Sequence, residues 1–135
     1  MKKKFALVWV LVLLAVVLAG CTSSRTGTWS ISGSHTGLQR SVNDEGLSIS
    51  GRTMNGRFTT NVELNAGNLA AFHVESSNSS GKASILLTQG NVERSFDISG
   101  AFSDNLDMGA FGAGRISVRF VFESAENVDI VISWG

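Results

Sequence analysis

The stretch that decides the fold is RISVRFVFE at residues 115–123, followed four residues later by VDIVISW at residues 128–134. In both segments every second residue is apolar, and most of the residues between are polar or charged. This alternation is typical of a β-strand with one buried and one solvent-facing side. We therefore predict two amphipathic strands whose apolar faces share one core, formed by Ile116, Val118, Phe120, Phe122, Val128, Ile130, Ile132 and Trp134.

Shorter alternating runs precede this pair along the chain. We expect strands over residues 28–33, 38–42, 47–51, 57–64, 69–75, 82–89 and 92–99. Asn55-Gly56 is a dipeptide typical of two-residue hairpins, so it predicts a turn between the strands at 47–51 and 57–64. Residues 65–68 (NAGN) predict the next turn.

This pattern predicts an all-β domain over residues 28–135. No run of ten or more residues has a helical apolar stripe, and the chain contains neither proline nor tyrosine. Eight or nine short strands in a chain of this length favour an antiparallel β-sandwich, jelly-roll-like or immunoglobulin-like. A small closed β-barrel is the alternative.

The N-terminus carries a separate signal. Three lysines at residues 2–4 precede an unbroken apolar run at residues 5–17, and Leu18-Ala19-Gly20-Cys21 follows. A basic segment, a short apolar segment and small residues in that order are typical of a secretory signal. The apolar run is shorter than the roughly 20 residues that a membrane-spanning helix needs.

Leu18-Ala19-Gly20-Cys21 resembles the lipobox of bacterial lipoproteins. The resemblance implies that residues 1–20 are a signal peptide and that the Cys21 thiol receives a diacylglycerol, with a further acyl chain such as palmitate on the new amino terminus. Two or more acyl chains anchor a protein stably. Residues 21–27 would then be a lipidated cysteine and short tether, on the extracytoplasmic face of a bacterial membrane. Thr22 in place of aspartate implies the outer membrane in a host with two membranes, and the outer face of the cell membrane otherwise.

Charge and chemistry exclude several classes of function. Residues 21–135 contain eight Lys and Arg against eleven Asp and Glu, a formal net charge of −3, which argues against nucleic-acid binding. Ser79-Ser80-Gly81-Lys82 and Ser103-Asp104-Asn105 match two motifs of penicillin-binding proteins, but the third motif, Lys-Thr-Gly, is missing. His35 and His73 have no partners at metal-ligand spacing. We therefore expect no enzyme and no cofactor.

Residues 100–114 form the longest segment without a strand pattern, and long loops in small domains are often functional. The segment combines polar and apolar side chains: Phe102, Asp104, Asn105, Asp107, Met108 and Phe111. These side chains predict a loop that clasps a cationic, partly apolar peptide. The alternative is a loop that covers the end of the core, and its carboxylates leave a Ca²⁺ site open.

Together these features predict a lipid-anchored surface protein of the cell envelope whose domain binds a protein, a peptide or an envelope component. Three alternatives remain open. The protein could be an immunity or accessory lipoprotein, an enzyme or ligand carrier with a site built from loops, or a structural envelope protein. A deep pocket with convergent polar groups would favour the enzyme or carrier, and a flat apolar patch would favour the binding module.

Overall fold

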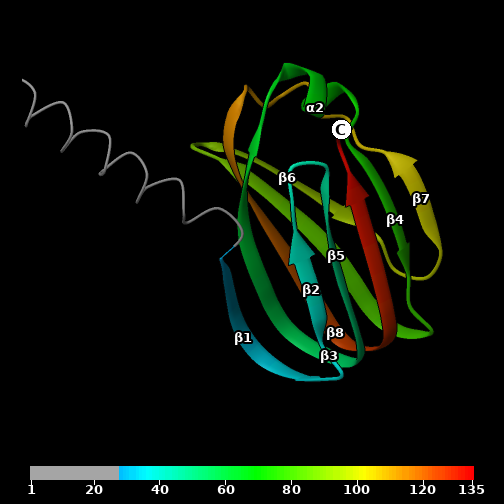
Figure 1. Cartoon of the computed structure of the whole chain (residues 1–135). Coiled ribbons are helices and arrows are strands. Elements are labelled where there is room, and N and C mark those ends of the chain that lie inside the picture. Colours follow the sequence, from blue (N-terminus) through cyan, green and yellow to red (C-terminus); the bar gives the residue numbers. More distant parts are fainter. Residues whose placement is uncertain (1–27) are drawn as a thin grey trace, which may run out of the picture.

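The computed structural model describes residues 28–135, which form an almost entirely antiparallel β-structure with eight strands and one short helix (Figure 1). The predicted all-β class is confirmed. The elements are β1 (Trp29–Thr36), β2 (Gln39–Val42), β3 (Gly46–Leu64), α2 (Ala66–Ala70), β4 (His73–Ser77), β5 (Ser80–Gln89), β6 (Val92–Asp97), β7 (Phe102–Asn105) and β8 (Gly114–Ser133). The predicted signal peptide, Cys21 and the predicted tether up to residue 27 lie outside the described residues.

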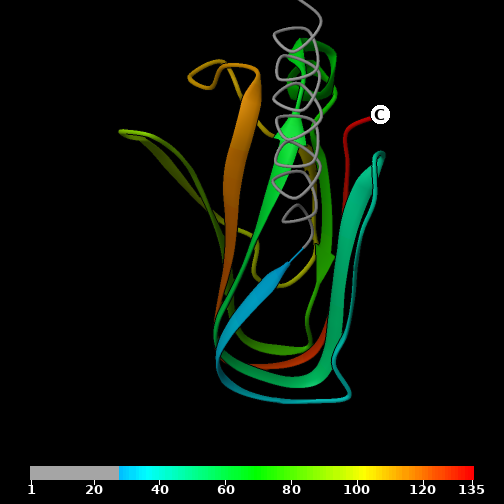
Figure 2. The same cartoon turned by 60° about the vertical axis from the view of Figure 1, so that its left-hand side comes forward.

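Two long strands belong to both layers of the fold. β3 and β8 pair with each other along almost their whole length, from Gly46 opposite Ser133 to Leu64 opposite Gly114. Both strands bend at the same end of the molecule, so the sheet folds back on itself (Figure 2). The first layer contains β1, residues 56–64, residues 114–122, β5 and β6, and the second contains β2, residues 46–54, residues 125–133, β4 and β7.

The predicted hairpin at Asn55-Gly56 is wrong, because both residues lie inside β3. The β3–β8 register shifts between Met54 and Gly56, which marks a bulge. Gly56 has a φ of 124°, and the Asn55 side chain accepts a hydrogen bond from the Ser124 N–H at 3.1 Å. A dipeptide that tolerates positive φ serves a bulge as well as a turn, and the bulge lets β3 bend between the layers.

The two strands predicted at 115–123 and 128–134 are halves of one strand, β8. The break in the alternation lies at the bend, where Ser124 and Asn127 have φ values of 46° and 52°. The pairing of β8 with β3 continues across the bend, with Thr53 opposite Glu126 and Met54 opposite Ala125. The alternation therefore assigned the residues to the correct faces, but it did not show that the two segments form one continuous strand.

The core lies between the two layers. All eight alternating apolar residues predicted to face it are buried, as the sequence pattern required. Aromatic rings form its centre, with Phe58 edge-on to Phe122 at 5.4 Å between ring centroids and Phe120 stacked on Phe122 at 6.3 Å. Trp29 stacks on Phe120 at the margin of the core.

The strand predicted at 69–75 starts too early. Its first two residues belong to the end of the helix α2, and β4 starts only at His73. Asn65 and Asn68 form a capping box. The Asn65 side chain accepts from the Asn68 N–H at 2.8 Å, and the Asn68 side chain accepts from the Asn65 N–H at 2.9 Å. Such reciprocal bonds satisfy amide donors at a helix start, so the predicted turn is extended into one helical turn.

The sheet is open, and the closed-barrel alternative is wrong. Within residues 28–135, β6 pairs with β5 alone and β7 pairs with β4 alone, so each leaves a free edge. The architecture is an antiparallel β-sandwich. No helix in this part of the chain is both long enough and apolar enough to span a bilayer.

Candidate functional site

The segment predicted to be an irregular binding loop is partly regular. Phe102–Asn105 form the edge strand β7, which pairs with β4 in a register that places Ser103 opposite Glu75. The sequence prediction of an unbroken loop over residues 100–114 is therefore wrong at its start. The strand is only four residues long and its side chains do not alternate in hydrophobicity, so its pairing with β4 is what defines it.

The remainder of that segment covers the end of the core. Leu106, Met108 and Phe111 are buried, with Phe111 only 6% exposed. They face α2 across a hollow of about 370 Å³ that Ala66 and Leu69 also line. Three of the predicted site residues, Asp107, Met108 and Phe111, thus meet at α2, away from Phe102.

The carboxylates of this segment make local hydrogen bonds. Asp104 accepts from the Asn105 N–H at 2.8 Å, and Asp107 accepts from the Gly109 N–H at 3.0 Å. Both bonds stabilise the backbone of the segment itself. Over residues 28–135, no three His, Cys, Asp or Glu side chains are grouped so that they could hold a metal ion.

The Asp104 bond also changes the character of the β7 edge. Leu106 donates its N–H to the Phe72 carbonyl, so by strand alternation the N–H of Asn105 points away from β4, toward the open edge. The Asp104 carboxylate accepts a hydrogen bond from this outward-pointing N–H of Asn105. A short edge strand with a carboxylate on its free donor is poorly suited to pairing with another strand.

The outer face of the second layer is more open to a ligand. We name it the serine face and define it by the residues of β2, β3, β8, β4 and β7 that alternate with the buried ones. They are Gln39, Ser41, Gly46, Ser48, Ser50, Asp129, Val131, Ser133, His73, Glu75, Ser77, Ser103 and Asn105. Val131, at 46% exposure, is the exposed large hydrophobic residue of the described chain.

A groove of about 450 Å³ lies on this face between β8 and β7. Its lining combines apolar, hydroxyl and carboxylate groups: Glu75, Ser76, Ser77, Ala101, Phe102, Ser103, Asp129 and Val131. Small residues of β4, β7 and the segment before β7 make up half of this lining: Ser76, Ser77, Ala101 and Ser103. Phe102 is the one residue of the predicted site that borders it.

The charges around the groove have one sign. Glu75 and Asp129 are both exposed, and no residue that lines the groove is Lys or Arg. The outer face of the first layer differs, because it carries both signs: Arg57, Arg115, Arg119 and Lys82 lie there beside Glu63 and Glu123. The serine face is therefore the side of the sandwich that would attract a cation.

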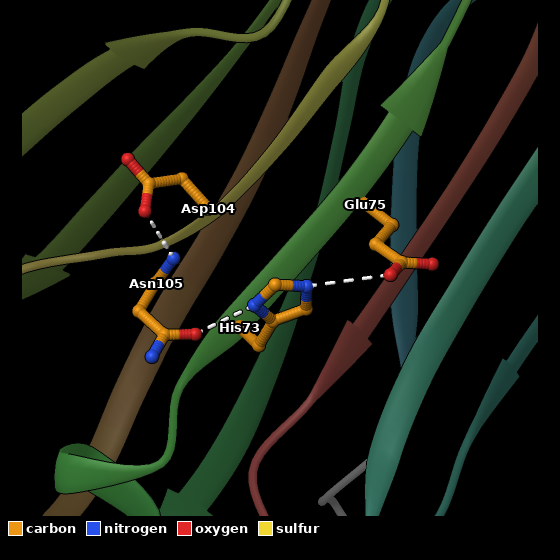
Figure 3. Close-up of polar contacts among 4 residues, drawn as sticks. All are labelled: His73, Glu75, Asp104 and Asn105. Atoms are coloured by element: carbon orange, nitrogen blue, oxygen red, sulfur yellow. Dashed lines mark hydrogen bonds and ion pairs between the residues drawn. The ribbon is translucent and has the colours of Figure 1, made fainter.

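His73 is held at one end of this groove by two neighbours (Figure 3). Its Nδ1 lies 2.6 Å from Asn105 Oδ1, and its Nε2 lies 3.4 Å from Glu75 Oε1. An N–H on Nδ1 donates to the Asn105 oxygen, which leaves Nε2 facing the Glu75 carboxylate. Nε2 donates to Glu75 only when it also carries a proton, and the doubly protonated ring then forms an ion pair with that carboxylate.

The other residues considered for catalysis are placed elsewhere. His35 packs edge-on against Phe58, at 5.9 Å between ring centroids. Ser79 donates to the Glu126 carbonyl, and Lys82 lies on β5 opposite Glu123. The lysine that follows Ser79 by three residues is thus on a strand, not one helical turn away as the penicillin-binding motif requires.

Sequence reasoning missed Glu75, Asp129 and Val131 as candidate site residues. A signal for Val131 was present, because it is an apolar residue on the polar phase of the strand segment VDIVISW. Its two flanking positions on that phase, Asp129 and Ser133, are polar. No local pattern showed that β4 would place Glu75, which lies 56 residues earlier in the chain, beside Val131.

No family model matches the chain. No curated protein matches it. A solved structure with some similarity is that of TmCBM61, a carbohydrate-binding module, in complex with β-1,4-galactotriose. Its TM-score is 0.40, the two sequences are 18% identical, and the alignment covers 83% of this chain and 89% of that chain. The site of this protein is therefore assigned from its own geometry.

Proposed function

We propose that the protein is a non-enzymatic binding module, anchored by lipid at the outer side of a bacterial membrane, and that its serine face binds a cationic, partly apolar peptide segment of a partner. The observation that carries the proposal is the groove between β8 and β7. It brings two exposed carboxylates, Glu75 and Asp129, next to the exposed side chain of Val131. Phe102, which packs against the core, borders the groove.

The chemistry of the groove selects this ligand class. Lysine or arginine side chains would pair with Glu75 and Asp129, and an apolar side chain would cover Val131, which is 46% exposed. Exposed ion pairs contribute only about 0.2–1 kcal/mol each, so burial of the apolar contact has to supply much of the affinity. A small, wide groove of this kind suits a transient complex better than a permanent one.

The shape of the site favours binding over catalysis. The groove is a wide, shallow hollow on a sheet, whereas enzymes usually close a deep pocket around their substrate. His73, the histidine nearest to it, is bonded to Asn105 and Glu75, with no serine among its hydrogen-bond partners in the described part of the chain. An immunity or accessory lipoprotein that intercepts a peptide close to the membrane is one form that this function could take.

The binding test uses the full chain in phosphatidylcholine nanodiscs, so that the lipid itself is uncharged. The probe is a fluorescein-labelled hexapeptide of alternating lysine and leucine, read by fluorescence anisotropy against empty nanodiscs. Glu75→Gln/Asp129→Asn should weaken binding roughly tenfold, the equivalent of about 1.4 kcal/mol. The matched control, Glu63→Gln/Glu123→Gln, removes two exposed carboxylates from the outer face of the first layer and should bind like the wild type.

Two outcomes would contradict the proposed site. One is a wild-type protein that binds the peptide no better than empty nanodiscs do. The other is an equal loss of affinity in the two double variants, which would show a general effect of net charge.

The anchor is tested separately. Only a cysteine thiol can form the thioether to diacylglycerol, and Cys21 is the single cysteine of the chain. In a bacterial host fed a labelled fatty acid, the wild type should carry label, and Cys21→Ser should carry none and keep its leader. Equal label on both proteins would refute lipidation at Cys21.

A further inference from the structure

The serine face carries a second hollow beside the first. It has a volume of about 240 Å³ and is lined by residues of β2, β3, β8 and the β2–β3 connection: Ser41, Asn43, Glu45, Gly46, Leu47, Ser48, Val131, Ile132 and Ser133. Val131 borders both hollows. The two hollows therefore flank a single apolar side chain on one continuous face.

The strand register aligns these hollows in one row. Glu75 is paired with Ser103 on one side and with Val131 on the other. Val131 is in turn paired with Ser48, and Ser48 with Ser41. A line from β7 to β2 thus crosses all five strands of the layer. It meets a serine on β7, β3 and β2, Glu75 on β4 and Val131 on β8.

We propose that one extended peptide occupies this row, crossing the strands from β7 to β2 and filling both hollows, an inference that rests on the proposed function. The row spans four strand intervals, about 19 Å at roughly 4.8 Å each. An extended chain advances about 3.3 Å per residue, so about six residues cover the distance. The occupant is a segment of about six residues, with an apolar side chain near its middle.

Charge supports the second hollow as part of the same site. Glu45 is the charged residue of its lining, and no Lys or Arg lines either hollow. Glu75 lies on β4 within the row, and Glu45 lies just before β3, two strands across the sheet and three residues along the chain from Ser48, which is roughly 14 Å from Glu75. Cationic side chains about four residues apart, which point to the same side of an extended chain, would therefore meet a carboxylate on each side of Val131.

Crossing the face is favoured over extending the sheet at the β7 edge. The Asn105 N–H at that edge is already bonded to Asp104. The face, by contrast, presents serine hydroxyls that can donate to or accept from a peptide backbone. Ser41 and Ser48 lie 2.9 Å apart at their oxygens, so either one could turn to a ligand.

The test compares peptide length with a variant that fills the second hollow. Ser48→Phe places a bulky side chain in the row, and the matched control Ser117→Phe does so on the outer face of the first layer, where Ser117 is paired with Asn61 and Thr88. Both serines are half-buried on central strands. Fluorescein-labelled Lys-Leu-Lys and the hexapeptide of alternating lysine and leucine are titrated onto the full chain in phosphatidylcholine nanodiscs.

We expect the hexapeptide to bind at least tenfold more tightly than the tripeptide. Ser48→Phe should weaken hexapeptide binding at least fivefold and leave tripeptide binding unchanged. Ser117→Phe should leave the binding of both peptides unchanged. Thermal unfolding of both variants checks that the fold is retained. If Ser48→Phe has a lower unfolding midpoint than the wild type, Ser48→Lys is used in its place. Ser48→Lys should weaken the binding of the hexapeptide alone, because the new cation lies in the row.

Two results would overturn the inference. Equal affinity of the two peptides for the wild type, or hexapeptide binding unchanged in a folded Ser48 variant, would confine the ligand to the groove between β8 and β7. The proposed function would survive either result, provided that Glu75→Gln/Asp129→Asn still weakens tripeptide binding. Absence of binding by both peptides would overturn the proposed function as well.

Discussion

Phe120 on β8 lies directly opposite Phe58 on β3, and both side chains are completely buried. The neighbouring pair in the register, Arg119 opposite Thr59, faces the solvent side, where the Arg119 Nε donates to the Thr59 hydroxyl at 3.2 Å. A shift of one residue would exchange these two pairs between core and solvent.

Truncation at adjacent residues tests this register. Phe120→Ala should lower the free energy of unfolding by about 3–5 kcal/mol, because it leaves a cavity in the aromatic centre of the core. Arg119→Ala should cost less than about 1 kcal/mol, since it removes a half-buried side chain on the solvent-facing side and one hydrogen bond. Denaturant unfolding measures both, and similar losses would mean that the register is wrong by one residue.

The bulge in β3 depends on a glycine with a backbone that other residues rarely adopt. Gly56 has a φ of 124°, and a Cβ there would lie 2.2 Å from the Ser32 carbonyl oxygen. Gly56→Ala should therefore cost at least about 2 kcal/mol of stability. Gly90 is a suitable control, because its φ is 57° and a Cβ added there would meet no heavy atom of the described chain within 4 Å.

Gly90→Ala should cost about 1 kcal/mol, the ordinary penalty for a left-handed residue in a turn. Chemical denaturation of the two variants gives the comparison. If Gly56→Ala were as mild as Gly90→Ala, β1 and β3 would not approach as closely as the structure places them.

The segment after β7 distinguishes a cap from a binding loop. Phe111→Ala should lower stability by about 3 kcal/mol, because Phe111 is buried at the end of the core. Asp104→Ala/Asp107→Ala removes two exposed carboxylates and should change stability by less than about 1 kcal/mol. Thermal unfolding and hexapeptide anisotropy are measured on both variants. A double aspartate variant that stays stable but loses peptide binding would restore the loop as the ligand site.

Asp97 is predicted to make a local contribution to the pH dependence of stability. The Ser99 N–H, which donates to Asp97 at 2.9 Å, lowers the pKa of that carboxyl below its usual 3.8, with further contributions from the Ser99 hydroxyl and from Lys82. A lowered folded-state pKa adds stability above the unfolded value, and that stability is lost as the pH falls through the folded value.

Asp97→Asn should therefore be less stable than the wild type at about pH 6, with the difference closing as the pH falls below 3.8. Urea unfolding at a series of pH values measures it. Glu93→Gln, on the same strand, is measured in parallel as the control for the loss of a carboxylate from β6. A stability difference that persists unchanged to about pH 2 would exclude Asp97 as the source.

The sequence by itself determined which side chains form the core. Alternation of apolar and polar residues at 115–123 and 128–134 assigns each residue to one face of a strand, because the side-chain period of a strand is two whatever the strand pairs with. All eight apolar residues of these segments that we predicted to face the core are buried in the structure. The leader and Cys21 are likewise a local pattern, and the localisation inferred from them stays a prediction.

Only the tertiary structure decided how the strands connect and where a ligand could bind. Asn55-Gly56 and Ser124 allow a turn or a bulge equally well, and their long-range pairing selects the bulge. The groove needs β4, β7 and β8 side by side, so that Glu75, Phe102 and Val131 meet. Residues so far apart in the chain leave no local signature, because their proximity comes from the pairing of strands and not from their spacing in the sequence.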